Sequence, residues 1–434
     1  MPTTSPSRLA PAWTWRDGKP TPGLEVEIAP DGRIAAVGPA QPGARALPGT
    51  LLLPGFVDAH SHAFQRALRG WGERFPAHVE TFWTWREAMY SLVDAMTEEL
   101  VYERSLDAFR EMAAAGITTV GEFHYLHHDA TGAGFALDRA VLSAARDAPI
   151  RLALLESYYA RGGFDDEPLK GGQLRFATLD EGEFLRQLDR LAQALDPARA
   201  TLGLAPHSLR AVPIDVLARL HALGRQRGMV VHLHLEEQPR EVERCRAVHG
   251  VTPMELVLAR LDVDAGTCAV HCTHTMPELL VRYAARGGMV CCCPTTEGNL
   301  GDGIPRLSAL REAGLLDRLA LGTDSNARID MLEEMRWLEY GQRLAGLERG
   351  VLRDSGGRVA RVLLDAATRG GATALGVDAG TIEPGRWADF ALVDANEPSI
   401  AGVPPELLPE SLCFGARTSA IANRCVGGAW DRAL

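Results

Sequence analysis

The fold of this chain is decided by the stretch Leu51-Leu52-Leu53-Pro54-Gly55-Phe56-Val57-Asp58-Ala59-His60-Ser61-His62. Its apolar first part is typical of a buried strand, and two histidines follow that strand directly. Residues two apart in a strand point to the same side, so both imidazoles project together at the strand's end. Two imidazoles in that arrangement are suited to bind one metal ion. We therefore expect residues 51–57 to form a strand that delivers two ligands of a metal site.

Seven further apolar runs follow, most of them separated by amphipathic helical patterns. They are residues 117–123, 150–155, 201–205, 229–235, 268–271, 289–293 and 319–323. Fully apolar strands that alternate with helices indicate a parallel sheet covered by helices. Eight such β/α units predict an α/β fold, a TIM-like (β/α)8 barrel.

Each of the eight runs ends in polar residues. These are His60/His62, His124/Tyr125, Glu156, His207, His234/Glu237, His271, Thr295/Thr296 and Asp324. The carboxyl ends of barrel strands build the active site in barrel enzymes. We therefore expect these side chains to surround one functional site.

Both ends of the chain differ from its middle. Short alternating runs, broken by glycine and proline, occupy residues 24–37 and 381–394. Either end alone is small for a stable β domain. We predict that residues 1–53 and 378–434 pair into one small β-sandwich domain, beside a catalytic barrel formed by residues 54–377.

The composition excludes several classes of partner. The net charge is −11 and no long basic run occurs, which disfavours nucleic-acid binding. No apolar stretch is long enough to span a bilayer, and the first residues lack the features of a secretion signal. The eight cysteines form no CxxC pair, so we expect them to be reduced and buried in a cytoplasmic protein. Zinc held by these thiols is a weaker alternative.

Four of the strand-end residues have the donor atoms of a catalytic metal site, which needs about three protein ligands and water. They are His60, His62, His234 and Asp324. His232 competes with His234 for the ligand role, and we prefer His234 because Glu237 follows it by three residues. Zinc fits these donors, and Fe²⁺ or Mn²⁺ could occupy the same ligands.

The acidic residues and one further histidine supply candidates for proton transfer. Hydrolysis at an amidine-like carbon needs an activated water and a proton carrier to the departing nitrogen. Glu237 is the candidate carrier, His271 can orient the water or stabilise charge, and Asp324 can accept the water's proton. Taken singly, these residues are more often a solvated carboxylate, a backbone-bonded histidine and a helix N-cap. Their joint occurrence at strand ends favours catalysis.

These residues resemble the amidohydrolase superfamily, in its deaminase branch. The resemblance rests on residues 54–62, 232–237, 271, 322–325 and 380–389. Longer strings are similar to the formimidoylglutamate deiminases, a family within that branch. They are residues 60–67, 82–87, 121–125, 206–210, 294–303 and 334–341.

The resemblance implies an activity and a set of site residues. It implies a barrel enzyme of histidine degradation, a homodimer, that converts N-formimidoyl-L-glutamate to N-formyl-L-glutamate and ammonia. It implies one zinc ion per subunit on His60, His62, His234 and Asp324. It implies Glu237 and His271, with Asp324, as the proton-handling residues. Substrate contacts would fall on Gln65, Arg86, Tyr125, His207 and Arg210.

The scarcity of lysine bears on the number of metal ions in the site. A carboxylated lysine often bridges two ions in barrels of this kind, but this chain has only Lys19 and Lys170. Lys19 precedes the barrel and Lys170 lies in a loop-like stretch, so neither is expected to reach the site. A single metal is favoured, although Glu156 could also bridge.

Two arginines bear on the class of substrate that the site binds. A dicarboxylate needs local guanidinium groups, and Arg86 and Arg210 follow barrel strands. The nearest rival is another deaminase of the same branch, acting on guanine, a cytosine-like ring or an adenosine derivative. Such flat and largely neutral substrates do not need paired arginines. The second rival, a non-catalytic metal-binding or metabolite-binding protein, does not need Glu237 and Asp324.

Overall fold

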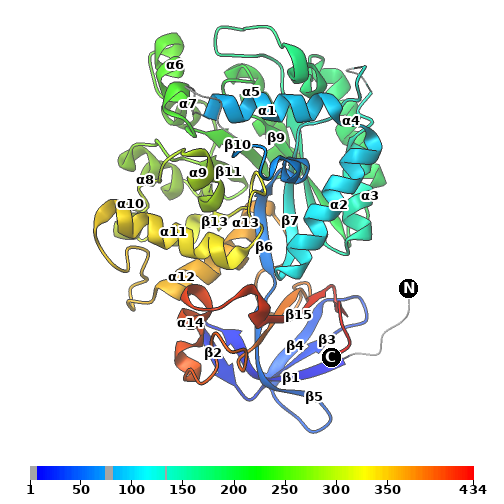
Figure 1. Cartoon of the computed structure of the whole chain (residues 1–434), viewed down its shortest axis with the longest axis vertical. Coiled ribbons are helices and arrows are strands. Elements are labelled where there is room, and N and C mark those ends of the chain that lie inside the picture. The colour runs from blue at the N-terminus through cyan, green and yellow to red at the C-terminus, as the bar shows by residue number, and fades with distance from the viewer. Residues whose placement is uncertain (1–6, 74–81, 132–133) are drawn as a thin grey trace.

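A barrel of eight parallel strands forms the larger part of the molecule (Figure 1). The computed structural model describes residues 7–73, 82–131 and 134–434. The barrel strands neighbour one another in chain order and are β6 (Phe56–Ser61), β7 (Ile117–His124), β8 (Arg151–Tyr158), β9 (Ala200–Pro206), β10 (Val231–Leu235), β11 (Thr267–His271), β12 (Met289–Cys292) and β13 (Leu319–Leu321). The expected (β/α)8 architecture is confirmed.

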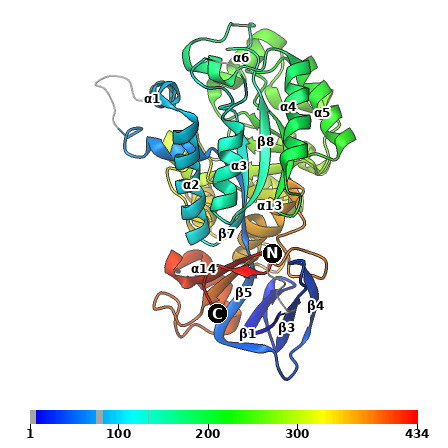
Figure 2. The same ribbon diagram turned by 90° about the vertical axis from the view of Figure 1, so that its right-hand side faces the viewer.

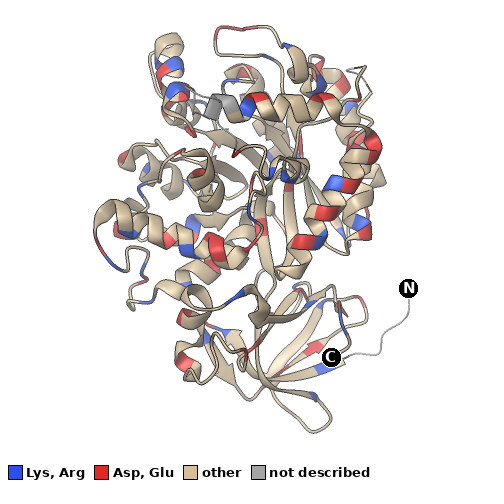
Figure 3. Cartoon of the chain, in the orientation of Figure 1, with Lys and Arg blue, Asp and Glu red and all other residues tan. Residues whose placement is uncertain are grey.

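Helices surround the barrel, and many Lys, Arg, Asp and Glu residues lie on them (Figure 3). They are α1 (Phe82–Ala95), α2 (Glu98–Ala114), α3 (Asp138–Asp147), α4 (Glu181–Ala194), α5 (Ile214–Arg227), α6 (Pro239–His249), α7 (Pro253–Arg260), α8 (Pro277–Ala285), α9 (Pro294–Leu300), α10 (Ser308–Glu312), α11 (Met331–Gly346) and α12 (Val359–Asp365). In α2, for example, the Thr97 hydroxyl accepts from the Leu100 backbone N–H at 3.2 Å, and Phe109 and Met112 are buried.

The barrel closes between its last and first strands, just beyond β13. The backbone N–H of Asp324 donates to the His60 carbonyl at 2.9 Å, and the His62 N–H donates to the Asp324 carbonyl at 2.8 Å. Gly322 permits this approach, because a Cβ atom there would lie 2.7 Å from the His60 carbonyl oxygen. Barrel closure therefore places residues from both ends of the sheet side by side.

The opposite mouth of the barrel is covered by the short helix α13 (Gly371–Leu375). This helix packs against β6, β12 and β13, and its Ala374 carbonyl accepts from Nε2 of His232 on β10 at 2.8 Å. A helix that meets strands from both sides of the barrel must lie across its end. His232 therefore points toward the closed mouth.

Both ends of the chain contribute to a second sheet, which lies below the barrel in Figures 1 and 2. Its strands are β1 (Ser7–Arg16), β2 (Lys19–Pro22), β3 (Leu24–Ile28), β4 (Ile34–Pro39), β5 (Arg45–Pro54), β14 (Phe390–Asp394), β15 (Ile421–Val426) and β16 (Ala429–Trp430). All eight are connected in one sheet, antiparallel except for the β1–β5 pair. β5 joins the two halves by pairing with β1 and β14.

The second sheet has a hydrophobic core of its own, which includes Leu9, Val26 and Phe390. The helix α14 (Leu408–Phe414) lies in the C-terminal segment between β14 and β15. The pairing of both termini agrees with expectation, while the exact domain limits at residues 53/54 and 377/378 stay a prediction.

The first apolar run is shared between the two sheets. Leu51 to Pro54 end β5 in the terminal sheet, and β6 of the barrel begins at Phe56. Gly55 makes the turn between them, where an added Cβ would lie 2.2 Å from the Thr118 hydroxyl oxygen. Apolar periodicity does not reveal such a division, because both halves of the run are equally buried.

All eight cysteines are buried and unpaired with one another, as expected. In the described part of the chain, no helix combines the length and apolar character needed to cross a bilayer.

One buried ion pair links the barrel to the terminal sheet. Arg151 on β8 binds the Asp389 carboxylate through two N–O contacts of 2.8 and 3.1 Å, and the side chains are 4% and 1% exposed. Replacing Asp389 by alanine leaves a buried guanidinium without its counter-charge, so we expect a loss of about 3–5 kcal/mol in unfolding free energy. Urea denaturation measures this loss.

The matched control removes an exposed ion pair from the same molecule. Asp189 binds Arg227 at 2.7 Å, with side chains 55% and 32% exposed. Asp189→Ala should cost at most about 1 kcal/mol. Equal destabilisation by the two substitutions would contradict the role assigned to Asp389.

Candidate active site

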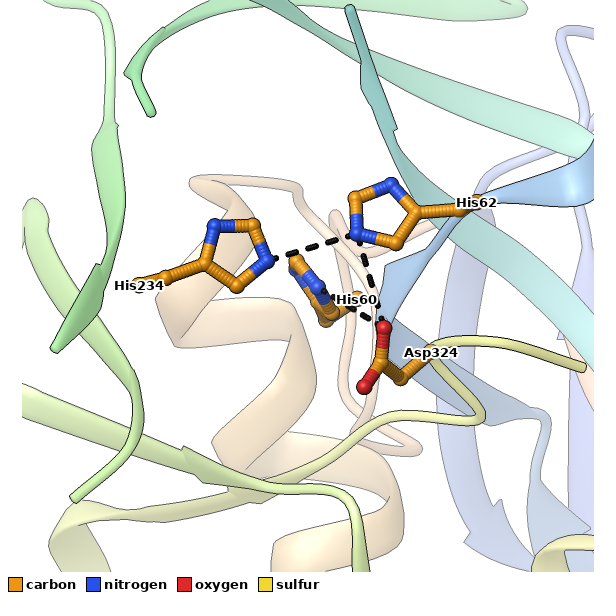
Figure 4. A group of neighbouring side chains, drawn as sticks. All are labelled: His60, His62, His234 and Asp324. Carbon is orange, nitrogen blue, oxygen red and sulfur yellow. Dashed lines mark hydrogen bonds and ion pairs between the residues drawn. The ribbon is translucent and has the colours of Figure 1, made fainter. Parts of the chain in front are cut away.

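Four side chains converge at the open mouth of the barrel (Figure 4). His60 and His62 come from β6 and its end, His234 from β10, and Asp324 from the segment after β13. Their possible ligand atoms all lie within 4.8 Å of one another. Nε2 of His62 is 3.3 Å from Nε2 of His234 and 3.4 Å from Oδ1 of Asp324. These are the four residues expected from the sequence to meet.

Hydrogen bonds to the backbone orient two of these imidazoles. Nδ1–H of His62 donates to the Phe123 carbonyl at 2.8 Å, and Nδ1–H of His234 donates to the His207 carbonyl at 3.1 Å. Each neutral ring therefore keeps a lone pair on Nε2, and these lone pairs face each other across 3.3 Å. Two acceptors cannot bond one another, so the arrangement calls for a cation between them.

His60 adds a second observation that fits a metal. Both of its ring nitrogens are buried, and neither has a hydrogen-bond partner in the part of the chain that the structure describes. Its Nε2 lies 3.5 Å from Oδ1 of Asp324. A buried imidazole without partners is costly unless an ion binds it. The three imidazoles and Asp324 thus form a candidate metal site.

The electrostatics of the cluster favour the same protonation states that a metal requires. Burial, together with the neighbouring His60, lowers the pKa of His62 to about 3. Burial and the surrounding imidazoles also lower the pKa of His234. Burial opposes ionisation of Asp324, but the contact with His60 and the nearby His271 hold its pKa below the usual range. Neutral imidazoles beside an ionised carboxylate are the donor set of a divalent ion.

The segment that carries Asp324 is fixed by an unusual backbone. Asp324 has φ of 49°, in the left-handed region that residues with side chains rarely adopt. The preceding Thr323 donates through its N–H at 3.0 Å and its hydroxyl at 2.5 Å to the buried Asp58 carboxylate. These contacts hold the carboxylate of Asp324 toward the histidines.

His271 lies among three carboxylates on the other side of the cluster. Its Nε2 is 3.9 Å from Glu237 and 3.8 Å from Asp324, while its Nδ1 is 3.3 Å from Glu297. Burial opposes protonation, but Glu237 and the other two carboxylates raise the pKa of His271 well above its usual value. Burial raises the pKa of Glu237 in turn. The pair therefore combines an imidazole whose protonated form is favoured with a carboxyl group whose protonated form is also favoured.

The five residues expected to contact substrate line one cavity together with the metal cluster and the acid/base residues. The cavity wall includes Gln65, Arg86, Tyr125, His207, Arg210, His62, His234, Glu237, His271 and Asp324. Arg210 forms no ion pair or hydrogen bond with any residue that the structure describes. Nε of Arg86 donates to the Tyr90 hydroxyl at 2.7 Å. Nε2 of Gln65 lies 2.6 Å from the Tyr125 hydroxyl.

Glu156 and the two lysines, which were considered as bridging ligands, lie away from the metal cluster. Glu156 packs 3.4 Å from Nδ1 of His127, in a separate buried group with His124 and Asp138. Lys19 belongs to β2 of the terminal sheet, and Lys170 precedes a short 3-10 helix. The position of polar residues at strand ends therefore predicted the end of the barrel at which the site lies. It did not predict which of those side chains face the cavity.

Three residues at the site were not predicted from the sequence. Glu297 binds His271, and Tyr90 and Tyr159 line the cavity. Tyr159 directly follows β8, so the strand-end rule contained the signal for it, and Tyr90 lies one helical turn after Arg86. Of the motif at residues 82–87, the side chains of 82–84 lie outside the described residues.

Comparison with known proteins agrees with this fold and site. A model of the amidohydrolase family matches residues 51–424, and the chain belongs to this family. Formimidoylglutamate deiminase of Pseudomonas aeruginosa is 40% identical over 416 residues, which cover 94% of this chain and 90% of that protein. The family and this relative indicate a hydrolase of carbon–nitrogen bonds.

Two solved structures share the whole architecture. An amidohydrolase from Brucella melitensis superposes with a TM-score of 0.88 at 32% identity, covering 98% of this chain and 94% of that one. An adenosine deaminase from Xanthomonas campestris with bound zinc superposes with a TM-score of 0.79 at 25% identity, covering 98% and 92%.

Metal analysis distinguishes the two histidines of the HxH pair on β10. Loss of a residue that hydrogen-bonds to a metal ligand weakens metal binding by ~10–100-fold. Because His234 is itself a candidate ligand, we expect His234→Ala to weaken metal binding by more than this. His232→Gln should keep its metal, because a glutamine can still donate to the Ala374 carbonyl. Elemental analysis after dialysis measures both, and the opposite order of metal loss would contradict the site.

Proposed function

We propose that this protein catalyses the metal-dependent deimination of N-formimidoyl-L-glutamate to N-formyl-L-glutamate and ammonia. The proposal is supported by the similarity to formimidoylglutamate deiminase of Pseudomonas aeruginosa. It is also supported by a cavity in which a metal cluster, a proton carrier and two guanidinium groups face one another. Water adds to the formimino carbon. The bond between this carbon and the terminal nitrogen then breaks, and the nitrogen leaves as ammonia.

The observation that carries the substrate assignment is the environment of Arg210. Its guanidinium lines the cavity, and no hydrogen bond or ion pair ties it to any described residue. Arg86 lines the same wall from α1. A dicarboxylate supplies the two anions that such a pair of cations attracts, with each charged hydrogen bond contributing about 1.5–3 kcal/mol.

We propose one zinc ion on His60, His62, His234 and Asp324, with Fe²⁺ or Mn²⁺ as alternatives that the same donors accept. The zinc-bound adenosine deaminase of similar fold supports the choice of zinc. When bound, the ion lowers the pKa of water and so supplies the nucleophile.

The protein residues divide the proton transfers between them. Asp324, whose ionised carboxylate lies beside His60 and His62, accepts the proton of the attacking water. His271, which stays protonated between carboxylates, stabilises the negative charge that develops at the reacting centre. Glu237 carries a proton to the terminal nitrogen, which leaves as ammonia. Arg86 and Arg210 hold the two carboxylates so that the formimino carbon stays in place.

The main alternative is a deaminase that acts on a flat purine or pyrimidine, as the similar adenosine deaminase structure illustrates. An ammonia-release assay on metal-loaded protein separates the two proposals. We expect kcat/KM for N-formimidoyl-L-glutamate to exceed that for guanine, cytosine and adenosine by at least about 100-fold. Only formimidoylglutamate has two carboxylates that can pair with both arginines. Preferred turnover of any of the rings would refute the proposed substrate.

The resemblance also implies a place in histidine degradation and a homodimer, and the buried, unpaired cysteines favour a cytoplasmic location. We include these in the proposal because the relative of Pseudomonas aeruginosa carries the deiminase name. Sedimentation of the purified protein measures the oligomeric state, and cell fractionation measures the location.

Removal of the proton carrier tests the mechanism directly. Glu237→Gln keeps the size of the side chain but cannot deliver a proton, so kcat should fall about 10²–10⁴-fold. Metal content should stay at the wild-type value, because Glu237 is not among the four clustered ligands. Glu243→Gln, an exposed neighbour on α6, is the matched control and should keep full activity. A Glu237→Gln variant with normal turnover would disprove the assignment.

A further inference from the structure

Two tyrosine hydroxyls in the cavity wall share a hydrogen-bonding pattern. Nε of Arg86 donates to the Tyr90 hydroxyl at 2.7 Å, and Nε2 of Gln173 donates to the Tyr159 hydroxyl at 3.4 Å. Both tyrosines line the same cavity as Arg210 and Glu237. In each case the phenolic oxygen accepts a hydrogen bond, and its own proton remains to be placed.

The direction of both hydrogen bonds is fixed by chemistry. A guanidinium Nε–H can only donate, so Tyr90 must be the acceptor. The amide of Gln173 is oriented by the Lys170 backbone N–H, which donates to Oε1 at 3.0 Å and leaves Nε2 to face Tyr159. By contrast, Gln65 beside Tyr125 has an unpartnered Oε1, so the hydroxyl of Tyr125 is not fixed in the same way.

Neither hydroxyl proton finds an acceptor within the described residues. Among the described residues, the two hydroxyl groups contact only the donors named above. The ring of Phe176 lies 6.4 Å from Tyr90 and 5.7 Å from Tyr159 between centroids, and the Arg86 guanidinium lies 5.2 Å from the centroid of the Tyr90 ring. The ring of His207 lies 4.8 Å from Tyr159. Packing therefore holds both rings at the cavity, while their O–H groups stay available as donors.

These donors add to the two guanidinium groups already assigned to the substrate. A carboxylate has two oxygens with about four lone-pair directions, more than one guanidinium fills. Hydrogen bonds from O–H to an ionised carboxylate are short and about twice as strong as neutral ones. A cavity that combines guanidinium and hydroxyl donors is thus suited to anionic groups that carry several acceptors.

We propose that Tyr90 and Tyr159 donate hydrogen bonds to the substrate carboxylates, beside Arg86 and Arg210, and thereby select a ligand with two carboxylates over a ligand with one. This inference rests on the proposed function, since it assigns further contacts within the same site. Tyr90 has a second effect, because its oxygen also fixes the plane of the Arg86 guanidinium.

The test compares Tyr90→Phe and Tyr159→Phe with the wild-type protein. Each substitution removes only the hydroxyl, so the aromatic packing against Phe176 is kept. Binding of glutarate, with two carboxylates, and of butyrate, with one, is measured by calorimetry on metal-loaded protein. We expect the Kd of glutarate to rise about 10-fold or more in each variant, and that of butyrate to rise less, so that selectivity falls. KM for formimidoylglutamate should rise in parallel, with kcat within about twofold of wild type, because these contacts are made in ground and transition state alike.

The neighbouring Tyr158 provides a matched control. Its ring packs against Phe184 with centroids 5.2 Å apart, and it is not part of the cavity wall. Tyr158→Phe should keep wild-type binding of both acids, which separates a contact with the ligand from a general effect of losing a buried hydroxyl.

The outcomes distinguish this inference from the proposed function. Unchanged glutarate binding in both variants overturns the inference, as does a wild-type protein that binds glutarate no better than butyrate. A fall in kcat at unchanged KM also overturns it, since it would indicate a role in the chemical step. Absence of ammonia release by the wild-type protein refutes the proposed function, whereas the calorimetric comparison does not depend on turnover.

Discussion

The candidate site depends on one backbone contact, the pair of hydrogen bonds by which Asp324 joins the last strand of the barrel to the first. Because the N–H of Asp324 binds the His60 carbonyl and the His62 N–H binds the Asp324 carbonyl, three candidate ligands are held within one small region. Gly322 is needed just before this contact, since any side chain there would collide with His60. Closure of the barrel and assembly of the metal site are therefore the same structural event.

Burial then sets the chemistry of the residues that closure brings together. Backbone carbonyls of Phe123 and His207 accept hydrogen bonds from Nδ1–H of His62 and His234, so the lone pairs on the Nε2 atoms face inward. Burial lowers the pKa of the imidazoles in the metal cluster, whereas the carboxylates around His271 raise its pKa despite its burial. The same kind of side chain thus serves two purposes, and the difference comes from its neighbours.

One cavity wall includes His234 and Asp324 of the metal cluster together with Glu237 and His271, and it also includes Arg210, Tyr90 and Tyr159. Under the proposed function, the first four residues serve the reaction and the last three bind the substrate. The terminal sheet takes no part in the wall of this cavity. It supports the barrel from below through the buried pair of Arg151 and Asp389 (Figure 2).

The sequence by itself determined the barrel, the edge at which its site lies and the residue types of the metal cluster. Strand periodicity and strand-end position are local properties, and both can be read from consecutive residues. The sequence favoured His234 over His232, and the structure places His234 in the cluster while His232 binds the Ala374 carbonyl. Only the tertiary structure decided that Glu156 packs against His127 instead of joining the cluster, and that Tyr90 and Tyr159 line the cavity. The physical reason is that the direction of a side chain around a closed barrel depends on strand register, and its partners come from elements distant in the chain.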